Sequence, residues 1–161
     1  FLSHFNREVL LRILQNNDLQ FVPQFTAKPH VFVSRSNPLA KKSSVTREDL
    51  LAYPRLTYDQ GTNNSFYFSE ELYSTDESPK NIIVSDRATL FNLLIGLNGY
   101  TISSGILSSD LNGTDIASIP LESEECMEIG YIHPIDRPLS QMAQRYLEHF
   151  RTYIANYQSN Q

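Results

Sequence analysis

The stretch IIVSDRATLFNLLIGLNGYTISSGIL, residues 82–107, decides the fold of this chain. It opens with a β-branched run, which is typical of a buried strand. Ser85 or Asp86 then stands where a helix N-cap is needed, and the apolar residues that follow recur at helical spacing. Gly96 and Gly99 end the helix and let the chain return into a second strand, residues 100–104. The stretch therefore predicts a strand–helix–strand unit.

The segments just upstream extend this unit. The run TREDLLAY, which begins at Thr46, predicts a helix with a capping box in which Asp49 is the third helical residue. RLTYDQ, residues 55–60, predicts a strand, and the polar turn GTNNS leads into a helix over residues 65–73. Strand, helix, strand, helix, strand is the pattern of a parallel sheet covered on both faces.

The two ends of the chain carry further elements. Residues 6–14 predict an amphipathic helix, and residues 19–25 and 30–34 predict strands, with Pro23 placing the first at a sheet edge. Downstream, DIASIPL and MEIGYIH predict two strands separated by the acidic turn ESEE. A long helix that begins at Pro138 is the last element, because apolar residues recur there over several turns.

Composition limits the classes of function. With 13 Lys and Arg against 18 Asp and Glu, the net charge of −5 repels a phosphate backbone, so this segment is not predicted to contact DNA. The sequence has no apolar run long enough to span a membrane and no signal-peptide pattern. Cys126 is the only cysteine, which excludes an internal disulfide and favours a reducing compartment. A soluble cytoplasmic protein with no membrane partner is the expectation.

Signatures of catalysis are missing from the sequence. There is no Gly-x-Ser-x-Gly elbow, no phosphate-binding loop and no His-Glu-x-x-His helix. The four histidines are scattered, so neither a metal nor another cofactor is predicted. Side chains of adjacent carboxylates such as Glu70 and Glu71 point in different directions on a helix or strand, which is poor geometry for general acid–base catalysis. The sequence therefore predicts that the chain is not an enzyme.

Polar turns follow three successive predicted strands, and in a parallel sheet those strand ends share one edge. Ligands of open α/β sheets bind at that edge, where helix N-termini favour an anionic group. The alternative is that each polar cluster only caps its own helix. Arg87 would pair with an anionic ligand or would simply be solvated. The predicted ligand-binding residues are Gln60, Gly61, Thr62 and Asn63 after the first strand, Ser85, Asp86 and Thr89 after the second, and Ser104 after the third.

Four motifs in order carry a resemblance that covers essentially the whole chain. They are VFVSRSNPLA at residues 31–40, SSVTREDLLAYPRLTYDQG at 43–61, the stretch at 82–107, and LSQMAQRYLEHF in the last helix. Together they resemble the effector-binding domain of LysR-type transcriptional regulators. The motif sequences are most similar to the subset that regulates sulfur amino-acid metabolism.

The resemblance implies an α/β fold like that of periplasmic binding proteins, with two Rossmann-like lobes joined by two crossover strands and an effector between them. We expect the first lobe to be truncated, because the family's upstream strand and helix, whose first turn supplies hydroxyls to the effector, have no counterpart in these residues. We expect half of the cleft to be absent and effector affinity to be weak. The implied ranges are 1–29 plus 129–157 for the remnant of lobe I, 37–121 for a complete lobe II, 30–36 and 122–133 for the hinge, and 158–161 for a frayed tail.

The implied function is effector sensing and oligomerisation in a bacterial transcription factor. The effector would be a small molecule, an amino acid or a sulfur metabolite, and DNA would be contacted only by a winged helix-turn-helix that is absent here. The family implies homo-oligomers, dimers or tetramers, and the helix at 65–73 with Phe66, Tyr67 and Phe68 is the candidate interface on lobe II. The alternatives are a transporter's solute-binding protein with the same fold, and an enzyme that uses the same cleft.

Overall fold

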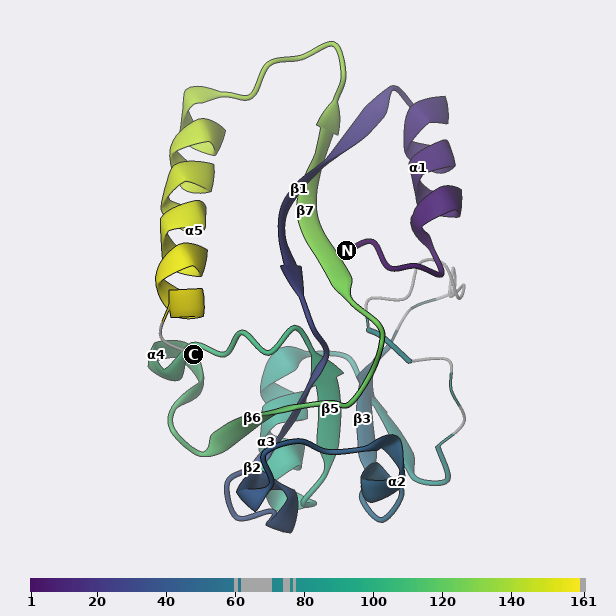
Figure 1. The fold of residues 1–161 in the computed structure, drawn as a ribbon, viewed down its shortest axis with the longest axis vertical. Helices are drawn as coiled ribbons and strands as arrows, with labels where there is room; N and C mark the ends of the chain where they lie inside the picture. Colours follow the sequence, from purple (N-terminus) through teal and green to yellow (C-terminus); the bar gives the residue numbers. More distant parts are fainter. Residues whose placement is uncertain (60, 62–70, 74–75, 77, 160–161) are drawn as a thin grey trace. The chain divides into compact units, whose positions relative to one another are not determined.

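The computed structural model of the chain describes residues 1–59, 61, 71–73, 76 and 78–159. The chain divides into two compact units, which can be followed in Figure 1. Unit 1 consists of Phe1–Thr26 and Glu128–Gln161, and unit 2 of Ala27–Met127. The chain therefore enters unit 2 after Thr26 and returns to unit 1 after Met127.

These boundaries differ in part from the ranges implied by the sequence. The return passage falls inside the implied hinge at 122–133, whereas the first passage precedes the implied hinge at 30–36. The reason is that His30–Ser34 forms a strand inside the unit 2 sheet, where it pairs on both sides. Unit 2 accordingly extends beyond the range 37–121 at both ends.

Unit 2 is built on a five-stranded sheet of order β4-β3-β5-β2-β6. Strand β3 pairs in parallel with both β4 and β5, as predicted from the strand–helix–strand pattern. Strand β2 runs antiparallel to β5 and β6, so the sheet as a whole is mixed. The crossover rule concerns connections between parallel strands, so it does not constrain β2. The strands are β2 (His30–Ser34), β3 (Arg55–Tyr58), β4 (Asn81–Val84), β5 (Tyr100–Ser103) and β6 (Ile116–Pro120).

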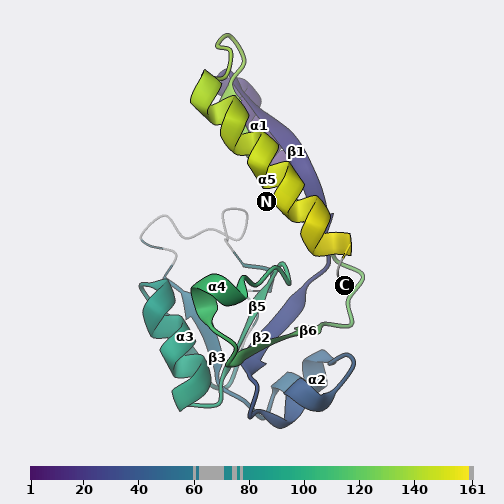
Figure 2. The same ribbon diagram turned by 90° about the vertical axis from the view of Figure 1, so that its left-hand side faces the viewer.

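Helices cover the two faces of this sheet. Helix α3 (Arg87–Gly96) lies on one face and α2 (Arg47–Leu50) on the other (Figure 2). The short elements η1 (Pro38–Lys41) and α4 (Ser109–Asn112) lie in the connections. The core on the α3 face consists of Phe32, Leu56, Val84, Leu90, Leu94 and Ile116. Burial of each large apolar side chain there contributes about 1.5–3 kcal/mol.

Caps fix the helix starts at the residues that the sequence indicates. The Thr46 hydroxyl accepts from the Asp49 N–H at 3.3 Å while the Asp49 carboxylate accepts from the Thr46 N–H at 3.0 Å, which confirms the capping box. At the end of α3 the left-handed residue is Asn98, with φ of +54°, rather than a glycine. Gly99 is needed instead for close packing, because a Cβ there would lie 2.9 Å from the Pro54 carbonyl oxygen.

Unit 1 contains a two-stranded sheet flanked by two helices. Strands β1 (Leu19–Ala27) and β7 (Met127–Pro134) pair with each other, and α1 (Arg7–Asn16) and α5 (Gln141–Ser159) lie on opposite sides of them (Figure 1). The strands approach so closely that a Cβ at Gly130 would lie 2.3 Å from the Val22 carbonyl oxygen. Within the described residues β1 pairs on one side only, which confirms the edge position predicted from Pro23.

Helix α5 packs on β1 through aromatic and aliphatic side chains. Phe150 lies 6.0 Å from Phe25 between ring centroids, and Leu147 and Ile154 are buried. The helix begins at Gln141 rather than at Pro138, with the Ser140 hydroxyl accepting from the Ala143 N–H at 3.2 Å. It continues to Ser159 and so includes the first two residues of the tail that the sequence predicts to be frayed.

Candidate functional site

The carboxyl ends of β3, β4 and β5 lie at the same edge of the unit 2 sheet, because these strands are parallel and β3 stands between the other two. The residues that follow them are Asp59 and Gly61 after β3, Ser85 after β4, and Ser104 after β5. The topology therefore brings three polar turns to one edge. We call this the carboxyl edge of unit 2.

After β3, the turn is described only in part. Gly61 has a left-handed backbone, with φ of +68°, and its N–H donates to the Asp59 carboxylate at 2.9 Å. Gln60, Thr62 and Asn63 lie outside the described residues, as do Phe66, Tyr67 and Phe68 of the predicted interface helix. The described end of that predicted helix, residues 71–73, is a turn.

Asp86 and Thr89 are bonded to each other at the start of α3. The Asp86 carboxylate accepts from the Thr89 N–H at 2.9 Å and from its hydroxyl at 2.7 Å. These bonds, the backbone bond first, lower the pKa of Asp86 below its usual 3.8, so the carboxylate is ionised at neutral pH. The structure thus supports the capping alternative for these two side chains. An anionic ligand at this helix start would meet a like charge.

Arg87 is engaged by its neighbours. It donates to the Asn112 side-chain oxygen at 3.0 Å, and its guanidinium lies 4.6 Å from the centroid of the Phe91 ring. Both contacts hold the side chain against α3 and the end of α4.

Close packing holds the turn after β5 in place. Gly105 has φ of +82°, and a Cβ there would lie 2.5 Å from the His30 ring. The Ser118 hydroxyl donates to the Gly105 carbonyl oxygen at 3.2 Å. Ser104, which is half-buried, therefore sits on a turn anchored by residues of β2 and β6.

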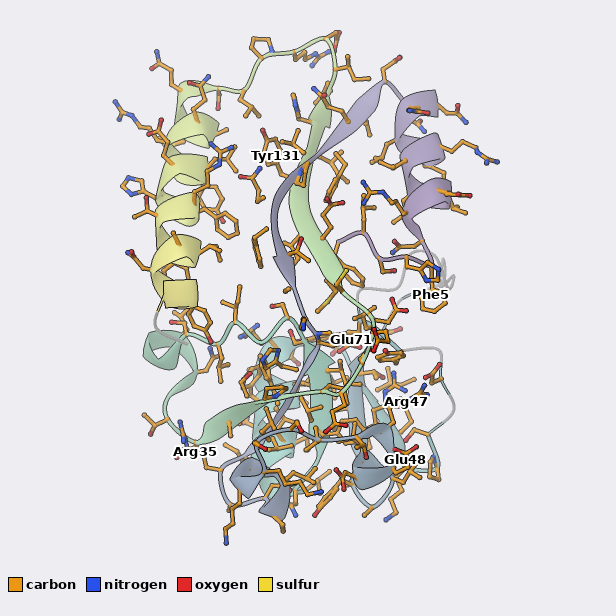
Figure 3. The ribbon with its side chains drawn as sticks, viewed as in Figure 1. Phe5, Arg35, Arg47, Glu48, Glu71 and Tyr131 are labelled. Atoms are coloured by element: carbon orange, nitrogen blue, oxygen red, sulfur yellow. The ribbon has the colours of Figure 1, made fainter. Side chains whose placement is uncertain are left out.

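Glu71 is a buried carboxylate near this edge that the sequence did not single out. Its carboxylate accepts from the Tyr58 N–H at 3.1 Å and from the Thr101 hydroxyl at 3.2 Å, and its side chain is labelled in Figure 3. Because Tyr58 ends β3 and Thr101 lies in β5, Glu71 joins the segment after residue 70 to the sheet. No sequence signal marks it, since Glu70–Glu71 looks like a solvated acidic pair.

The part of the chain that the structure describes has neither a metal-binding cluster nor a membrane-spanning helix. Three or more His, Cys, Asp or Glu side chains do not gather there in a way that would hold a metal ion. Among the same residues, no helix combines the length and apolar character needed to cross a membrane.

Comparison with known proteins identifies the family and the fold. The family model for the LysR substrate binding domain matches residues 9–155. A putative LysR family transcriptional regulator from Pseudomonas aeruginosa is similar, with a TM-score of 0.61 and 13% identity over 92% of this chain. The effector binding domain of QuiR is similar with a TM-score of 0.56 and 17% identity, over 89% of this chain and 75% of that one. The MetR regulatory domain from N. meningitidis gives 0.58 and 13%, over 84% and 64%. No curated protein sequence matches.

These neighbours are regulatory domains or whole regulators with the α/β, periplasmic-binding-protein-like fold, and at these identities they show that fold for this chain. This chain spans 57% of the length of the Pseudomonas aeruginosa regulator. The family model covers most of the sequence, including both units. The chain therefore belongs to the LysR substrate binding domain family.

Proposed function

We propose that this chain is the effector-sensing and oligomerisation domain of a LysR-type transcription factor, and that its effector binds at the carboxyl edge of unit 2. The observation that supports the proposal is the parallel order β4-β3-β5, which gathers three polar turns at one edge in a chain of this family. Such an edge is where open α/β sheets bind small ligands. The proposed effector-binding residues remain Gln60, Gly61, Thr62, Asn63, Ser85, Asp86, Thr89 and Ser104.

The electrostatics of the edge favour an effector that carries both signs of charge. QuiR was solved with shikimate and BenM with its effector benzoate, and both compounds are carboxylates. In this chain, a carboxylate would be repelled by Asp86 and by Asp59 of the Gly61 turn, and would lie nearer to Ser104. An ammonium group would suit Asp86. We therefore propose an amino acid, or a sulfur metabolite of that kind; the MetR domain is among the structural neighbours.

The role of the intact protein is part of the same proposal. We place it in the cytoplasm, as a dimer or tetramer that contacts DNA through a winged helix-turn-helix outside this chain. Effector binding would control transcription by shifting a conformational equilibrium, which needs only a few kcal/mol of differential affinity. A transporter's solute-binding protein is not favoured, because the neighbours named above are LysR-family regulators. We propose sensing without catalysis.

A thermal-shift titration of this chain with amino acids, thiols and other small carboxylates tests the proposal. A true effector at about 100 times its Kd stabilises the folded state by about 2.7 kcal/mol, which raises Tm by several degrees. Replacing Ser104 or Ser85 by Ala should reduce that shift, because each change removes a hydroxyl from the carboxyl edge. The exposed Ser43, which follows η1, provides the matched control Ser43→Ala, for which the shift should persist.

Two results would contradict the proposal. The first is a panel in which no compound raises Tm at saturating concentration. The second is a compound whose effect is equal in the wild type, Ser85→Ala and Ser104→Ala, because its site would then lie elsewhere.

A further inference from the structure

A pocket of about 250 Å³ lies in unit 2, away from the carboxyl edge. Arg55 and Tyr100, which open β3 and β5, form part of its lining, so the pocket lies at the amino ends of these strands. The pocket is also lined by Arg47, Glu48 and Leu50 of α2, by Leu51 just after that helix, and by the buried Ile102 of β5. We call it the α2 pocket. Its volume suits a small metabolite rather than a larger cofactor.

Arg55 places a nearly buried positive charge in the lining of this pocket. The residue is only 5% exposed, and its guanidinium donates to the backbone carbonyls of Asp76, at 3.1 Å, and Tyr73. Those bonds use two of its five N–H donors, and both acceptors are neutral. Among the residues that the structure describes, none of the ion pairs includes Arg55.

The carboxylate of Asp76 belongs to a residue that contacts this guanidinium, but it is already paired with another cation. Asp76 pairs with Arg47, whose guanidinium also lies 5.0 Å from the centroid of the Tyr73 ring. Arg47 and Glu48 are labelled in Figure 3 on α2, at this side of unit 2. Buried charges in proteins are almost always paired, and among the described residues the guanidinium of Arg55 donates only to backbone dipoles. Glu48 and Asp76 also line the pocket, so an additional anion is favoured at the Arg55 guanidinium itself rather than throughout the pocket.

Tyr100 adds a second polar group to the same lining. Burial raises the pKa of its phenol, while Arg55 and a hydrogen bond with Ser78 oppose that rise, so the hydroxyl is neutral at physiological pH. A guanidinium beside a neutral phenol matches a carboxylate, which can accept from both. Leu50, Leu51 and Ile102 supply an apolar wall for whatever the carboxylate is attached to.

We propose that the α2 pocket is a second ligand site, and that it binds a small monocarboxylate with its charge at Arg55 and its short apolar tail against Leu51. This site is distinct from the carboxyl edge and does not depend on the effector function proposed above. A ligand here would bind to unit 2 alone, because every described lining residue belongs to that unit.

The test is a titration of the ¹⁵N-labelled chain with sodium butyrate, followed by amide chemical shifts at constant ionic strength. The expected result is a saturable change at amides of α2, Arg55 and Tyr100, with little change at Ser85 and Ser104. Butylammonium chloride, which has the same tail and the opposite charge, should give no saturable change at these amides. Changes confined to Ser85 and Ser104 would assign butyrate to the carboxyl edge and overturn the proposal.

The variants separate recognition of the charge from stability of the fold. Arg55 is a poor target, because its guanidinium also holds two backbone carbonyls. Leu51 is 60% exposed, so Leu51→Asp should keep the fold, and its like charge should weaken butyrate binding at least about tenfold. Leu111→Asp, at an 84% exposed position in α4, is the matched control and should bind as the wild type does. Equal binding by Leu51→Asp and the wild type, or equal binding of butylammonium, would overturn the proposal.

Discussion

Asn37 shows how one buried polar side chain fixes a turn in unit 2. It is fully buried, its side-chain oxygen accepts from the Leu39 N–H at 2.9 Å, and its amide donates to the Asn98 carbonyl at 3.3 Å. The side chain thus starts η1 and ties it to the loop after α3. From sequence, this motif looks like an ordinary Asn-Pro turn. In the structure, its asparagine also joins two segments that are distant in the chain.

Replacing Asn37 by Ala should destabilise the chain by about 1–3 kcal/mol, because the Leu39 N–H and the Asn98 carbonyl lose the partner that this buried side chain provides. Urea unfolding measures the change. Asn156→Ala, at an exposed position of α5, is the control and should change stability by less than about 0.5 kcal/mol. Equal effects of the two substitutions would contradict this account of Asn37.

Asp86 predicts a pH dependence of stability. Its folded-state pKa is lowered below 3.8, chiefly by the Thr89 N–H, so its charge stabilises the fold above that value and the contribution is lost as pH falls through the folded pKa. Asp86→Asn keeps a capping oxygen and removes the charge. The wild type should therefore be more stable than Asp86→Asn at neutral pH, and the difference should shrink below pH 3.8. Urea titrations over this range would refute the assignment if the difference stayed constant.

Among the elements, the pairing of β1 with β7 depends on one glycine. A Cβ at Gly130 would lie 2.3 Å from the Val22 carbonyl and 2.6 Å from the Phe21 ring, so Gly130→Ala must push the strands apart. We expect a loss of about 1–3 kcal/mol, as for other overpacked sites. The matched control is Gly96→Ala at the end of α3, where nothing lies within 4 Å of the added methyl.

The control substitution Gly96→Ala is not expected to lower the stability of the chain. Alanine is favoured over glycine in a helix by about 1 kcal/mol, so Gly96→Ala should be neutral or stabilising. Thermal unfolding of both variants measures the contrast. A Gly130→Ala variant as stable as Gly96→Ala would show that β1 and β7 are not in close contact.

Local rules predicted the elements well and their tertiary roles less well. Thr46, Asp49 and Asp86 cap helices as predicted, because capping depends on residues three positions apart. The antiparallel direction of β2 and the burial of Glu71 depend on partners far away in sequence, and no local pattern encodes those. At the candidate site, the topology of β3, β4 and β5 followed from sequence, whereas the bond between Asp86 and Thr89 required coordinates.

At the scale of the whole molecule, the two units differ in how much core they hold. Unit 2 has a five-stranded sheet with Val31, Val33 and Leu56 fully buried, whereas unit 1 has a two-stranded sheet and its helix α1 has no buried residue. Two-stranded sheets are marginally stable without further packing. The units are therefore not expected to open with the same free energy.

Native-state hydrogen exchange should resolve this difference. Amides of β2 should exchange only through the largest opening, while amides of β1 should exchange through an opening of lower free energy. At low urea concentrations, the β1 amides should still exchange faster than the β2 amides, until global unfolding dominates the exchange of both. Coincident exchange of β1 and β2 would show that the units unfold as one cooperative body.

Unit 2 is one continuous run of chain, but unit 1 is assembled from segments on either side of it. During translation, β1 leaves the ribosome long before its partner β7 has been made. Unit 2 can fold as a nascent domain in that interval, since domains commonly fold as units during synthesis. Until β7 emerges, the Phe21, Val22 and Phe25 side chains of β1 have no partner strand and are exposed to chaperones. Unit 1 can therefore be completed only after β7 and α5 have been made, whatever the speed at which unit 2 folds.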